Sequence, residues 1–245
     1  MNTRIDRETL AARGLRRLGL SRVPKYGDAF YLIRKACTIN DPIIFDVGTH
    51  KGETAKIFKE LFRDCKIHCF EPNLFAFREL TSTFLNDPSV SLNNYALASD
   101  SGTALFYANS FSATSSIFPV TENVENLVWD KSLLSLESTY EIRKRSLDSY
   151  VRENSIKEID ILKIDVQGAE FLVLQGAIDQ LRSQTIKLIY FEYLNTETYK
   201  GQTELVEYIK LLKSFDYELF GIFSPCYRKN RLAQFDLMFV PISGK

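Results

Sequence analysis

Short apolar runs alternate along this chain with longer stretches whose apolar residues recur at helical spacing. The runs at 43–48, 66–70, 90–97, 159–166 and 186–193 are rich in β-branched and aromatic residues and predict buried strands. Stretches such as the one from Ala55 to Phe62 predict helices between them. Strands that alternate with helices form a mainly parallel sheet with helices on both faces. The pattern therefore predicts an α/β fold whose ligand site lies beyond the carboxyl ends of the strands.

The last two runs, 217–223 and 235–242, have only a polar loop between them and predict an antiparallel hairpin. They bring the expected sheet to seven strands in a doubly wound, Rossmann-like arrangement. Residues 1–37 predict a helical segment that Asn40-Asp41-Pro42 ends, so we expect an N-terminal helical extension over 1–41. The Rossmann-like domain is expected over 42–245, with an irregular, Ser/Thr-rich insertion at about 103–146 where the alternation breaks down.

Composition narrows the class of partner. The chain has 31 Lys+Arg and 31 Asp+Glu, and this zero net charge does not favour a nucleic acid. No apolar run approaches the roughly 20 residues of a membrane span. The chain has four cysteines, and at 245 residues it needs no disulfides for stability, which favours a reducing, cytoplasmic setting. Cys65, His68 and Cys69 fit no common zinc spacing, so no metal is predicted. The basic N-terminal segment predicts packing over the sheet or a homodimer contact, with an acidic partner or a membrane surface as the alternative.

A glycine-containing loop follows the first predicted strand. Its sequence, Asp46-Val47-Gly48-Thr49-His50-Lys51-Gly52, has the spacing D-x-G-x-x-x-G. Dinucleotide-binding loops place a second glycine where this chain has His50, to admit a pyrophosphate. A ligand without a pyrophosphate is therefore favoured, and Asp46 favours one that carries a positive group. The alternative is a purely structural turn from strand to helix.

Glu71 ends the second predicted strand, 71 − 48 = 23 residues after the first glycine of the loop. An acidic residue about 20 residues after such a loop accepts hydrogen bonds from the hydroxyls of a ribose. The loop and Glu71 together predict a nucleoside with a cationic tail, a description that S-adenosylmethionine meets. A solvated strand end is the alternative for Glu71.

Five segments of the sequence resemble one family. FDVGTHKGET (45–54), CFEPN (69–73), NNYALASDSG (93–102), SLDSYV (146–151) and DILKIDVQGAE (160–170) are similar to segments of the FkbM-type class I methyltransferases. The similarity runs from about 42 to 242. It implies a seven-stranded Rossmann-like sheet, S-adenosylmethionine as methyl donor, and transfer to a hydroxyl of a sugar, glycoside or secondary metabolite.

The resemblance also implies roles for individual residues. Asp46 and Gly48 would line the methionine end of the donor, Glu71 and Asn73 the ribose, and Asp165 the transferable methyl group. The expected cofactor contacts are completed by other residues of the same segments, namely Thr49, His50, Gly52, Pro72, Asn94, Ala96 and Leu97. The chain departs from the family at Thr49-His50, often Ala-Asn, and at Gln167, often Glu, which removes a carboxylate.

Methyl transfer to a hydroxyl needs a base within hydrogen-bond reach of the acceptor. The candidates at strand ends are Asp165, Glu192 and His50. Lys163 lies on the same strand face as Asp165, and would either lower the pKa of that carboxyl or itself act as a base. The structural alternatives are a Lys163–Asp165 ion pair, a loop contact for Glu192 and a helix cap for His50. The acceptor is expected to meet hydroxyls of the insertion, which are those of Ser112, Ser115 and Ser116.

Two other functions remain open at this point. A nucleotide-dependent oxidoreductase would use the same type of sheet, although the loop lacks the middle glycine. A non-catalytic protein that binds an adenosine cofactor would use the same site residues without a base.

Overall fold

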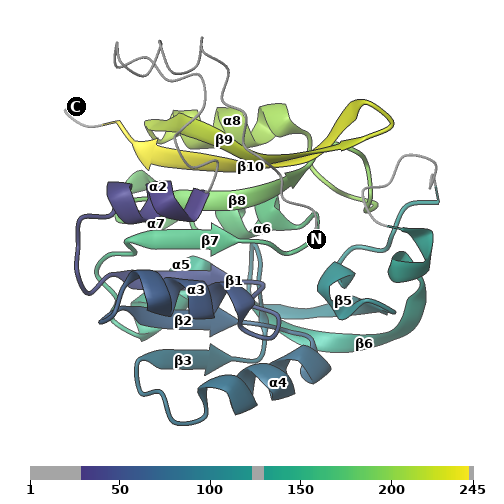
Figure 1. Cartoon of the computed structure of the whole chain (residues 1–245), viewed down its shortest axis with the longest axis horizontal. Coiled ribbons are helices and arrows are strands. Elements are labelled where there is room, and N and C mark those ends of the chain that lie inside the picture. Colours follow the sequence, from purple (N-terminus) through teal and green to yellow (C-terminus); the bar gives the residue numbers. More distant parts are fainter. Residues whose placement is uncertain (1–28, 123–129, 243–245) are drawn as a thin grey trace, which may run out of the picture.

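The computed structural model describes residues 29–122 and 130–242. Its centre is a seven-stranded sheet in the order β3-β2-β1-β7-β8-β10-β9 (Figure 1). The strands are β1 (Ile43–Val47), β2 (Lys66–Phe70), β3 (Val90–Asn93), β7 (Ile161–Ile164), β8 (Ile189–Leu194), β9 (Tyr217–Arg228) and β10 (Arg231–Pro241). Neighbouring strands from β3 to β8 are parallel, and β10 runs antiparallel to both β8 and β9. The predicted α/β class is confirmed, and β9 and β10 form the expected antiparallel hairpin.

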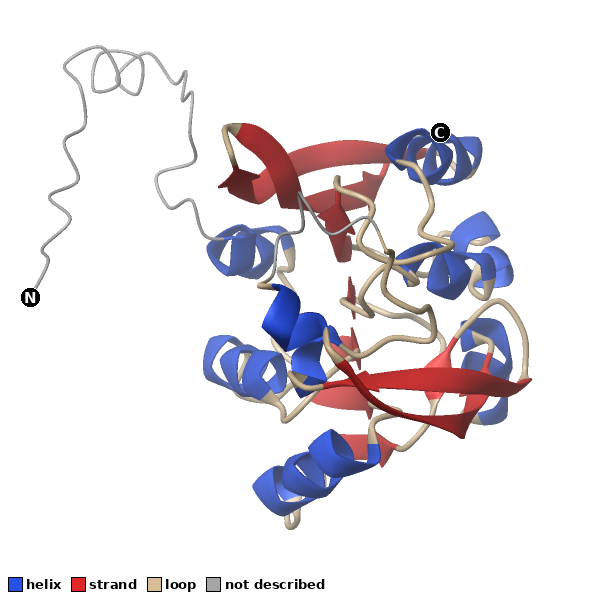
Figure 2. Cartoon of the chain, turned by 90° about the vertical axis from the view of Figure 1, so that its right-hand side faces the viewer, coloured by secondary structure: helices blue, strands red, loops and turns tan. Residues whose placement is uncertain are grey.

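Helices cover both faces of this sheet, which Figure 2 shows nearly edge-on between two helical layers. Ile33, Phe58 and Leu80, from three helices, pack on one face, whereas Tyr150 and Tyr208 pack on the other. The first layer consists of α2 (Ala29–Ala36), α3 (Glu53–Leu61) and α4 (Leu74–Phe84). The second consists of α5 (Leu147–Glu153), α6 (Glu170–Gln175), α7 (Ile178–Arg182) and α8 (Leu205–Ser214). Both faces of the sheet are therefore buried, as expected for parallel strands.

A second sheet lies beyond the carboxyl ends of the central strands (Figure 1). Its order is β4-β6-β5, from β4 (Ala96–Leu97), β5 (Gly102–Asn109) and β6 (Leu136–Arg145). Along the chain, the short 3₁₀ helices η1 (Ser112–Thr114) and η3 (Lys131–Leu134) come between its two long strands, β5 and β6. The segment expected to be irregular thus contains a regular antiparallel pair, in which Phe106 faces Tyr140 across the ladder.

Three predicted elements differ in the structure. The run at 90–97 is divided at Asn94-Tyr95 between β3 of the central sheet and β4 of the second sheet. After β7, the helical spacing of Phe171, Leu174, Ile178 and Leu181 predicts one helix, but the structure has two short helices, α6 and α7. Of the predicted N-terminal extension, only α2 and the residues up to 41 are described, and 1–28 lie outside the described residues. Among the helices of 29–122 and 130–242, none combines the length and apolar character that crossing a bilayer requires.

Candidate active site

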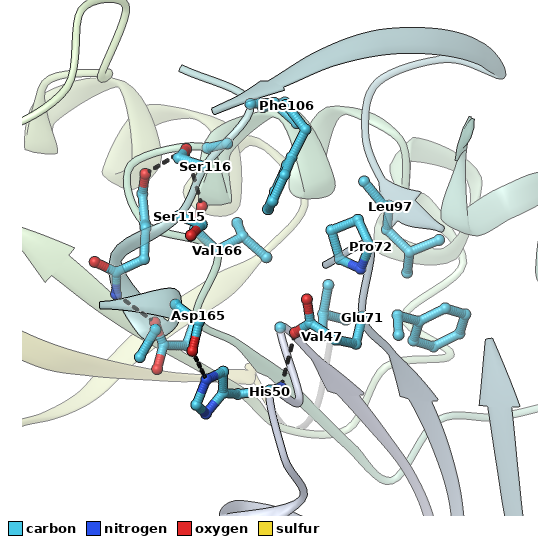
Figure 3. Close-up of a pocket in the computed structure, with 18 residues that line it drawn as sticks. Val47, His50, Glu71, Pro72, Leu97, Phe106, Ser115, Ser116, Asp165 and Val166 are labelled. Atoms are coloured by element: carbon cyan, nitrogen blue, oxygen red, sulfur yellow. Dashed lines mark hydrogen bonds between the residues drawn. The ribbon is translucent and has the colours of Figure 1, made fainter. Parts of the chain in front are cut away.

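A cleft of about 650 Å³, part of it open to solvent, lies where β1, β2 and β7 end (Figure 3). Its floor is formed by the loops after these strands, and its roof by η1 and the second sheet. Most of the predicted site residues line it, namely Gly48, His50, Glu71, Pro72, Ala96, Leu97, Ser112, Ser115, Ser116 and Asp165. Segments that are far apart in the sequence therefore meet at one edge of the sheet, where ligands of such folds bind.

Gly48 allows the ends of β1 and β7 to approach each other. Its backbone has φ +74°, a left-handed value that glycine adopts without a steric penalty. A Cβ atom at this position would lie 1.8 Å from the carbonyl oxygen of Asp165. The backbone N–H of Gly48 donates to the carbonyl of Phe70 at 2.9 Å, which joins the loop to the end of β2 as well.

Glu71 follows β2 directly and its carboxylate lies at the cleft wall. Oε2 accepts the backbone N–H of His50 at 2.8 Å, and Oε1 accepts that of Asn73 at 2.7 Å. Burial raises the pKa of Glu71 to about 7, although these two hydrogen bonds act to lower it. Each carboxylate oxygen keeps a further acceptor position, so both can still accept hydroxyls of a ribose.

Asp46 lies beneath the loop and does not line the cleft, so its predicted contact with a ligand is wrong in this structure. The side chain is fully buried, and Oδ1 is 3.0 Å from Lys163 Nζ. Asp46 pairs in register with Cys69 on one side and Lys163 on the other, so all three side chains point to the same face of the sheet. That face is the one that the first helical layer covers.

Lys163 holds the loop rather than acting as a base. Nζ donates to the carbonyl of Gly48 at 3.0 Å and lies 3.9 Å from Asp165 Oδ2. Burial by itself would lower the pKa of Lys163, but the carboxylates of Asp46 and Asp165 outweigh burial and raise it. These surroundings favour the ammonium form, which has no lone pair to accept a proton, so the alternative of an ion pair describes Lys163 better than the role of a base.

Thr49 and Gly52 shape the loop from inside. Thr49 Oγ1 donates to the carbonyl of Asp46 at 2.6 Å and accepts the backbone N–H of Phe70 at 3.2 Å. Gly52 begins α3, where a Cβ atom would lie 2.6 Å from the ring of Phe84. Both residues were predicted to contact the cofactor, but neither lines this cleft, and their contacts fix the path of the backbone.

Asn73 and Asn94 are likewise occupied by the backbone. Asn73 Oδ1 caps α4 by accepting the N–H groups of Phe75 and Ala76, at 3.0 and 3.2 Å. Asn94 Nδ2 donates to the carbonyl of Glu71 at 2.8 Å. Neither lines the cleft, so their predicted contacts with ribose and adenine are replaced by structural ones that hold Glu71 in place.

Asp165 follows β7 directly and lines both this cleft and a second, more open chamber of about 1030 Å³. Oδ1 accepts a hydrogen bond from Gln167 Nε2 at 2.8 Å, and the side chain is 38% exposed. The two cavities share the wall formed by Gly48, His50, Ser112, Ala113 and Asp165. Asp165 is therefore a predicted base that lines both cavities, as His50 also does.

Glu192 does not line either cavity. Gln167 Nε2 donates to its Oε2 at 2.9 Å, and Gln234 Nε2 hydrogen-bonds to its Oε1. Burial, and then the nearby carboxylate of Asp165, raise the pKa of Glu192 well above its ordinary value. The structural alternative considered for Glu192 thus describes its surroundings better than the role of a base.

His50 connects the floor of the cleft to its roof. The backbone is left-handed, with φ 54°, and its N–H is the one that Glu71 accepts. On the ring, Nε2 is 2.8 Å from Ser112 Oγ and Nδ1 is 3.3 Å from Glu53 Oε1. The ring thus stands in the wall between the two cavities, next to Asp165.

The three predicted serines differ in what their hydroxyls do. Ser115 Oγ accepts the backbone N–H of Asn109 at 3.1 Å, and Ser116 Oγ donates to the carbonyl of Gln167 at 2.8 Å. These two hydroxyls fasten the roof, whereas Ser112 lines both cavities. Of the three, Ser112 is the one placed to meet a second substrate.

Sequence reasoning missed the apolar wall of the cleft. Phe106 from β5 faces Leu97 and Pro72 (Figure 3), and Ile117 from the roof also lines the cleft. Residues 104–108 are all apolar or aromatic, so the sequence does not show that Phe106 and Ala108 are the ones that turn inward. An apolar slot with a carboxylate at its inner end fits an adenine ring joined to a ribose.

The charge balance of the site suits a cationic ligand. Asp46 neutralises Lys163 beneath the loop, which leaves the carboxylates of Glu71 and Asp165 at the cleft wall. The residues present therefore fit S-adenosylmethionine, whose sulfonium is positive and whose adenosine carries two ribose hydroxyls.

Comparisons with known proteins found methyltransferases. The sequence model of the Methyltransferase FkbM domain matches residues 46–219. The 2-O-methyltransferase NoeI of Sinorhizobium fredii is 26% identical over 179 residues, covering 72% of this chain and 73% of NoeI. The hexuronic acid methyltransferase AglP of Haloferax volcanii is 27% identical over 150 residues, covering 61% of this chain and 55% of AglP.

The crystal structure of methyltransferase FkbM from Methylobacillus flagellatus KT has the same fold, with a TM-score of 0.54 at 12% identity. The superposition covers 82% of this chain and 44% of that chain, so this chain spans less than half of the crystallised protein. It likewise spans about half the length of AglP. The fold and the family match define a class I methyltransferase, a class whose members use S-adenosylmethionine. Within that class, the chain belongs to the FkbM methyltransferase family.

Proposed function

We propose that this chain transfers a methyl group from S-adenosylmethionine to a hydroxyl of a sugar, a glycoside or a related small metabolite. The observation that carries the proposal is the placement of Glu71 and Asp165 on one cleft, with a second chamber on the other side of Asp165. The relatives support the acceptor class, since NoeI is named a 2-O-methyltransferase and AglP a hexuronic acid methyltransferase.

The donor occupies the first cavity in this proposal. When bound, it supplies an electrophilic methyl group that needs no further activation. Glu71 accepts the ribose hydroxyls, while Pro72, Leu97 and Phe106 enclose the adenine. Gly48 lets the backbone pass close to the methionine portion, and Asp165 offsets the positive sulfur. These residues bind and orient the donor, which is the main task in a displacement of this kind.

The acceptor occupies the second chamber. This chamber has polar and charged lining from Lys51, Thr54, Ser110 and Ser112, and an aromatic ring from Phe111. Hydroxyl-rich ligands bind to such a mixture of hydrogen-bonding groups and one ring face. Asp165 lies in the wall shared with the donor cavity, and its carboxylate takes the proton that the acceptor hydroxyl loses.

The test has a binding step and a turnover step. S-adenosylhomocysteine at 100 times its Kd should raise the free energy of unfolding by about 2.7 kcal/mol, and NAD should not. Incubation with a donor carrying a deuterated methyl group and a panel of glycosides, uronic acids and polyketide alcohols should add one labelled methyl group to a hydroxyl, detected by mass spectrometry. Stabilisation by NAD alone would support an oxidoreductase. Binding of S-adenosylhomocysteine with no methylated product would support the non-catalytic alternative.

A further inference from the structure

The side-chain amide of Gln167 lies between two carboxylates next to the proposed reaction centre. Its Nε2 donates to Asp165 Oδ1 at 2.8 Å and to Glu192 Oε2 at 2.9 Å. An amide nitrogen has two hydrogens, so both are used. The residue is 6% exposed, and solvent therefore competes little for these bonds.

Tyr199 fixes the other end of the amide. Its hydroxyl is fully buried, 3.1 Å from Gln167 Oε1 and 2.7 Å from the carbonyl of Thr114 in the roof. A reversed amide would place Oε1 between two carboxylate oxygens, where it would be repelled. The orientation with Nε2 toward Asp165 and Glu192 is therefore the favoured one.

The backbone of Gln167 is anchored as firmly as its side chain. Its φ of 56° is left-handed, and Ser116 Oγ donates to its carbonyl. The next residue, Gly168, packs so closely on Tyr199 that a Cβ atom there would lie 3.0 Å from the ring. Three separate segments, the loop after β7, the roof and the loop after β8, thus converge on this one residue.

We propose that Gln167 is a positioning residue for Asp165, an inference that rests on the proposed function. The neutral amide holds Oδ1 of Asp165 in place and leaves Oδ2 to accept the proton of the acceptor hydroxyl. It also places one N–H donor against each of Asp165 and Glu192, which offsets part of the repulsion between the two carboxyl groups. The hydroxyl of Tyr199, whose single hydrogen lies near both Gln167 Oε1 and the carbonyl of Thr114, closes the other end of the amide.

Because charged groups surround the amide, replacing Gln167 by glutamate tests its role. Asp165 and Glu192 face Nε2 directly, while Glu170, Asp236 and Lys163 lie in the same electrostatic neighbourhood. In Gln167→Glu, an ionised third carboxylate would repel the other two. When protonated, it would donate one hydrogen bond in place of two.

Two substitutions test the inference, with EDTA present so that no metal ion bridges an added carboxylate. Gln167→Leu should lower kcat about 10- to 100-fold and change Kd for S-adenosylhomocysteine less than about threefold, because Asp165 loses its hydrogen bond but the donor cavity keeps its walls. The kcat of Gln167→Glu relative to the wild type should fall as the pH rises from about 6 to about 8, because the new carboxyl ionises. Gln184→Leu is the matched control, since Gln184 also has a left-handed backbone and an amide that donates to loop carbonyls, away from both cavities.

A wild-type kcat in Gln167→Leu, or an equal loss in Gln184→Leu, would overturn the inference. A loss of affinity for S-adenosylhomocysteine as large as the loss of kcat would also overturn it. The side-chain amide resonance of Gln167, identified by its absence in Gln167→Leu, provides a reading without an acceptor. It should be protected from solvent exchange in the wild type and lose that protection in Asp165→Ala. If no acceptor is methylated, the proposed function fails. If the Gln167 amide of the wild type exchanges freely with solvent, the positioning role itself is rejected.

Discussion

The floor of the cleft is held by buried charges and left-handed backbone, whereas the roof is held by hydroxyls. In the floor, Lys163 joins Asp46 to the carbonyl of Gly48, and the loop turns on backbone that few side chains tolerate. The roof is joined by neutral hydrogen bonds, from Ser116 Oγ to the carbonyl of Gln167 and from the hydroxyl of Tyr199 to the carbonyl of Thr114. A buried charge pair is costly to break, while one neutral hydrogen bond contributes only about 1 kcal/mol.

This difference matches the tasks proposed for the two sides. The donor is the same molecule in every cycle, so a rigid floor can be built around its charge and its ribose. Of the relatives, NoeI is named for the 2-O position and AglP for a hexuronic acid. A roof joined by weak, separate contacts can change its lining without disturbing the floor. The predictions below test this division, from the largest expected effect to the smallest.

Asp165 is the point at which floor and roof act together. Asp165→Asn should lower kcat by about 10²–10⁴-fold, because an amide cannot take the acceptor proton. Its oxygen can still accept the hydrogen bond from Gln167, so affinity for S-adenosylhomocysteine should change little. Asp179→Asn is the control, because that carboxylate is exposed on α7. A kcat within about threefold of the wild type would place the base elsewhere.

The buried pair should matter for folding more than for ligand contact. Lys163→Met should lower the free energy of unfolding by about 3–5 kcal/mol, since it leaves Asp46 as an unpaired buried charge. Urea denaturation measures this loss. The double variant Asp46→Leu/Lys163→Met should recover most of it, because both charges are then gone. If the double variant is as unstable as the single one, the pair is not the source of the floor's rigidity.

The same pair explains which part of the site the sequence could predict. The strand-to-loop positions of Asp46, Glu71, Lys163 and Asp165 were evident from the apolar runs. Asp46 and Lys163 lie within β1 and β7, where alternation directs their side chains under the helices. Glu71 and Asp165 lie one residue beyond their strands, where alternation no longer applies and the side chains reach the cleft. Counting residues from the strand end, rather than charge alone, separates the two kinds of carboxylate.

The roof could not be derived in this way. The run at 90–97 looks like one strand, and only its tertiary partners divide it between two sheets. Asn73 and Asn94 have side chains that either a ligand or a backbone can satisfy, and the sequence does not say which partner is nearer. Local patterns specified the central sheet, whereas pairing between distant segments specified the second one.

Glu71 gives the floor a dependence on pH that the roof should lack. Burial raises its pKa to about 7, so the ribose-accepting carboxylate predominates above that pH and the neutral acid below it. Affinity for S-adenosylhomocysteine should therefore fall about tenfold as the pH drops from about 8 to about 6, and calorimetry can follow it. Glu71→Gln should bind weakly at both pH values. Glu170→Gln is the control, because burial also raises the pKa of Glu170 to about 7 but that side chain does not line the cleft. An unchanged slope in Glu71→Gln would assign the titration to another group.

Ser112 should give the smallest effect and should affect only the acceptor side. Ser112→Ala removes the partner of His50 Nε2 and one polar group of the second chamber. A single neutral hydrogen bond is worth about 1 kcal/mol, so KM for the acceptor should rise about fivefold. Kd for S-adenosylhomocysteine should stay within about twofold, because the backbone N–H of His50 still donates to Glu71. Ser135→Ala, at an exposed site after η3, should change neither constant. Equal losses of donor and acceptor affinity in Ser112→Ala would mean that roof and floor are coupled through His50, and that the acceptor side cannot change independently of the donor side.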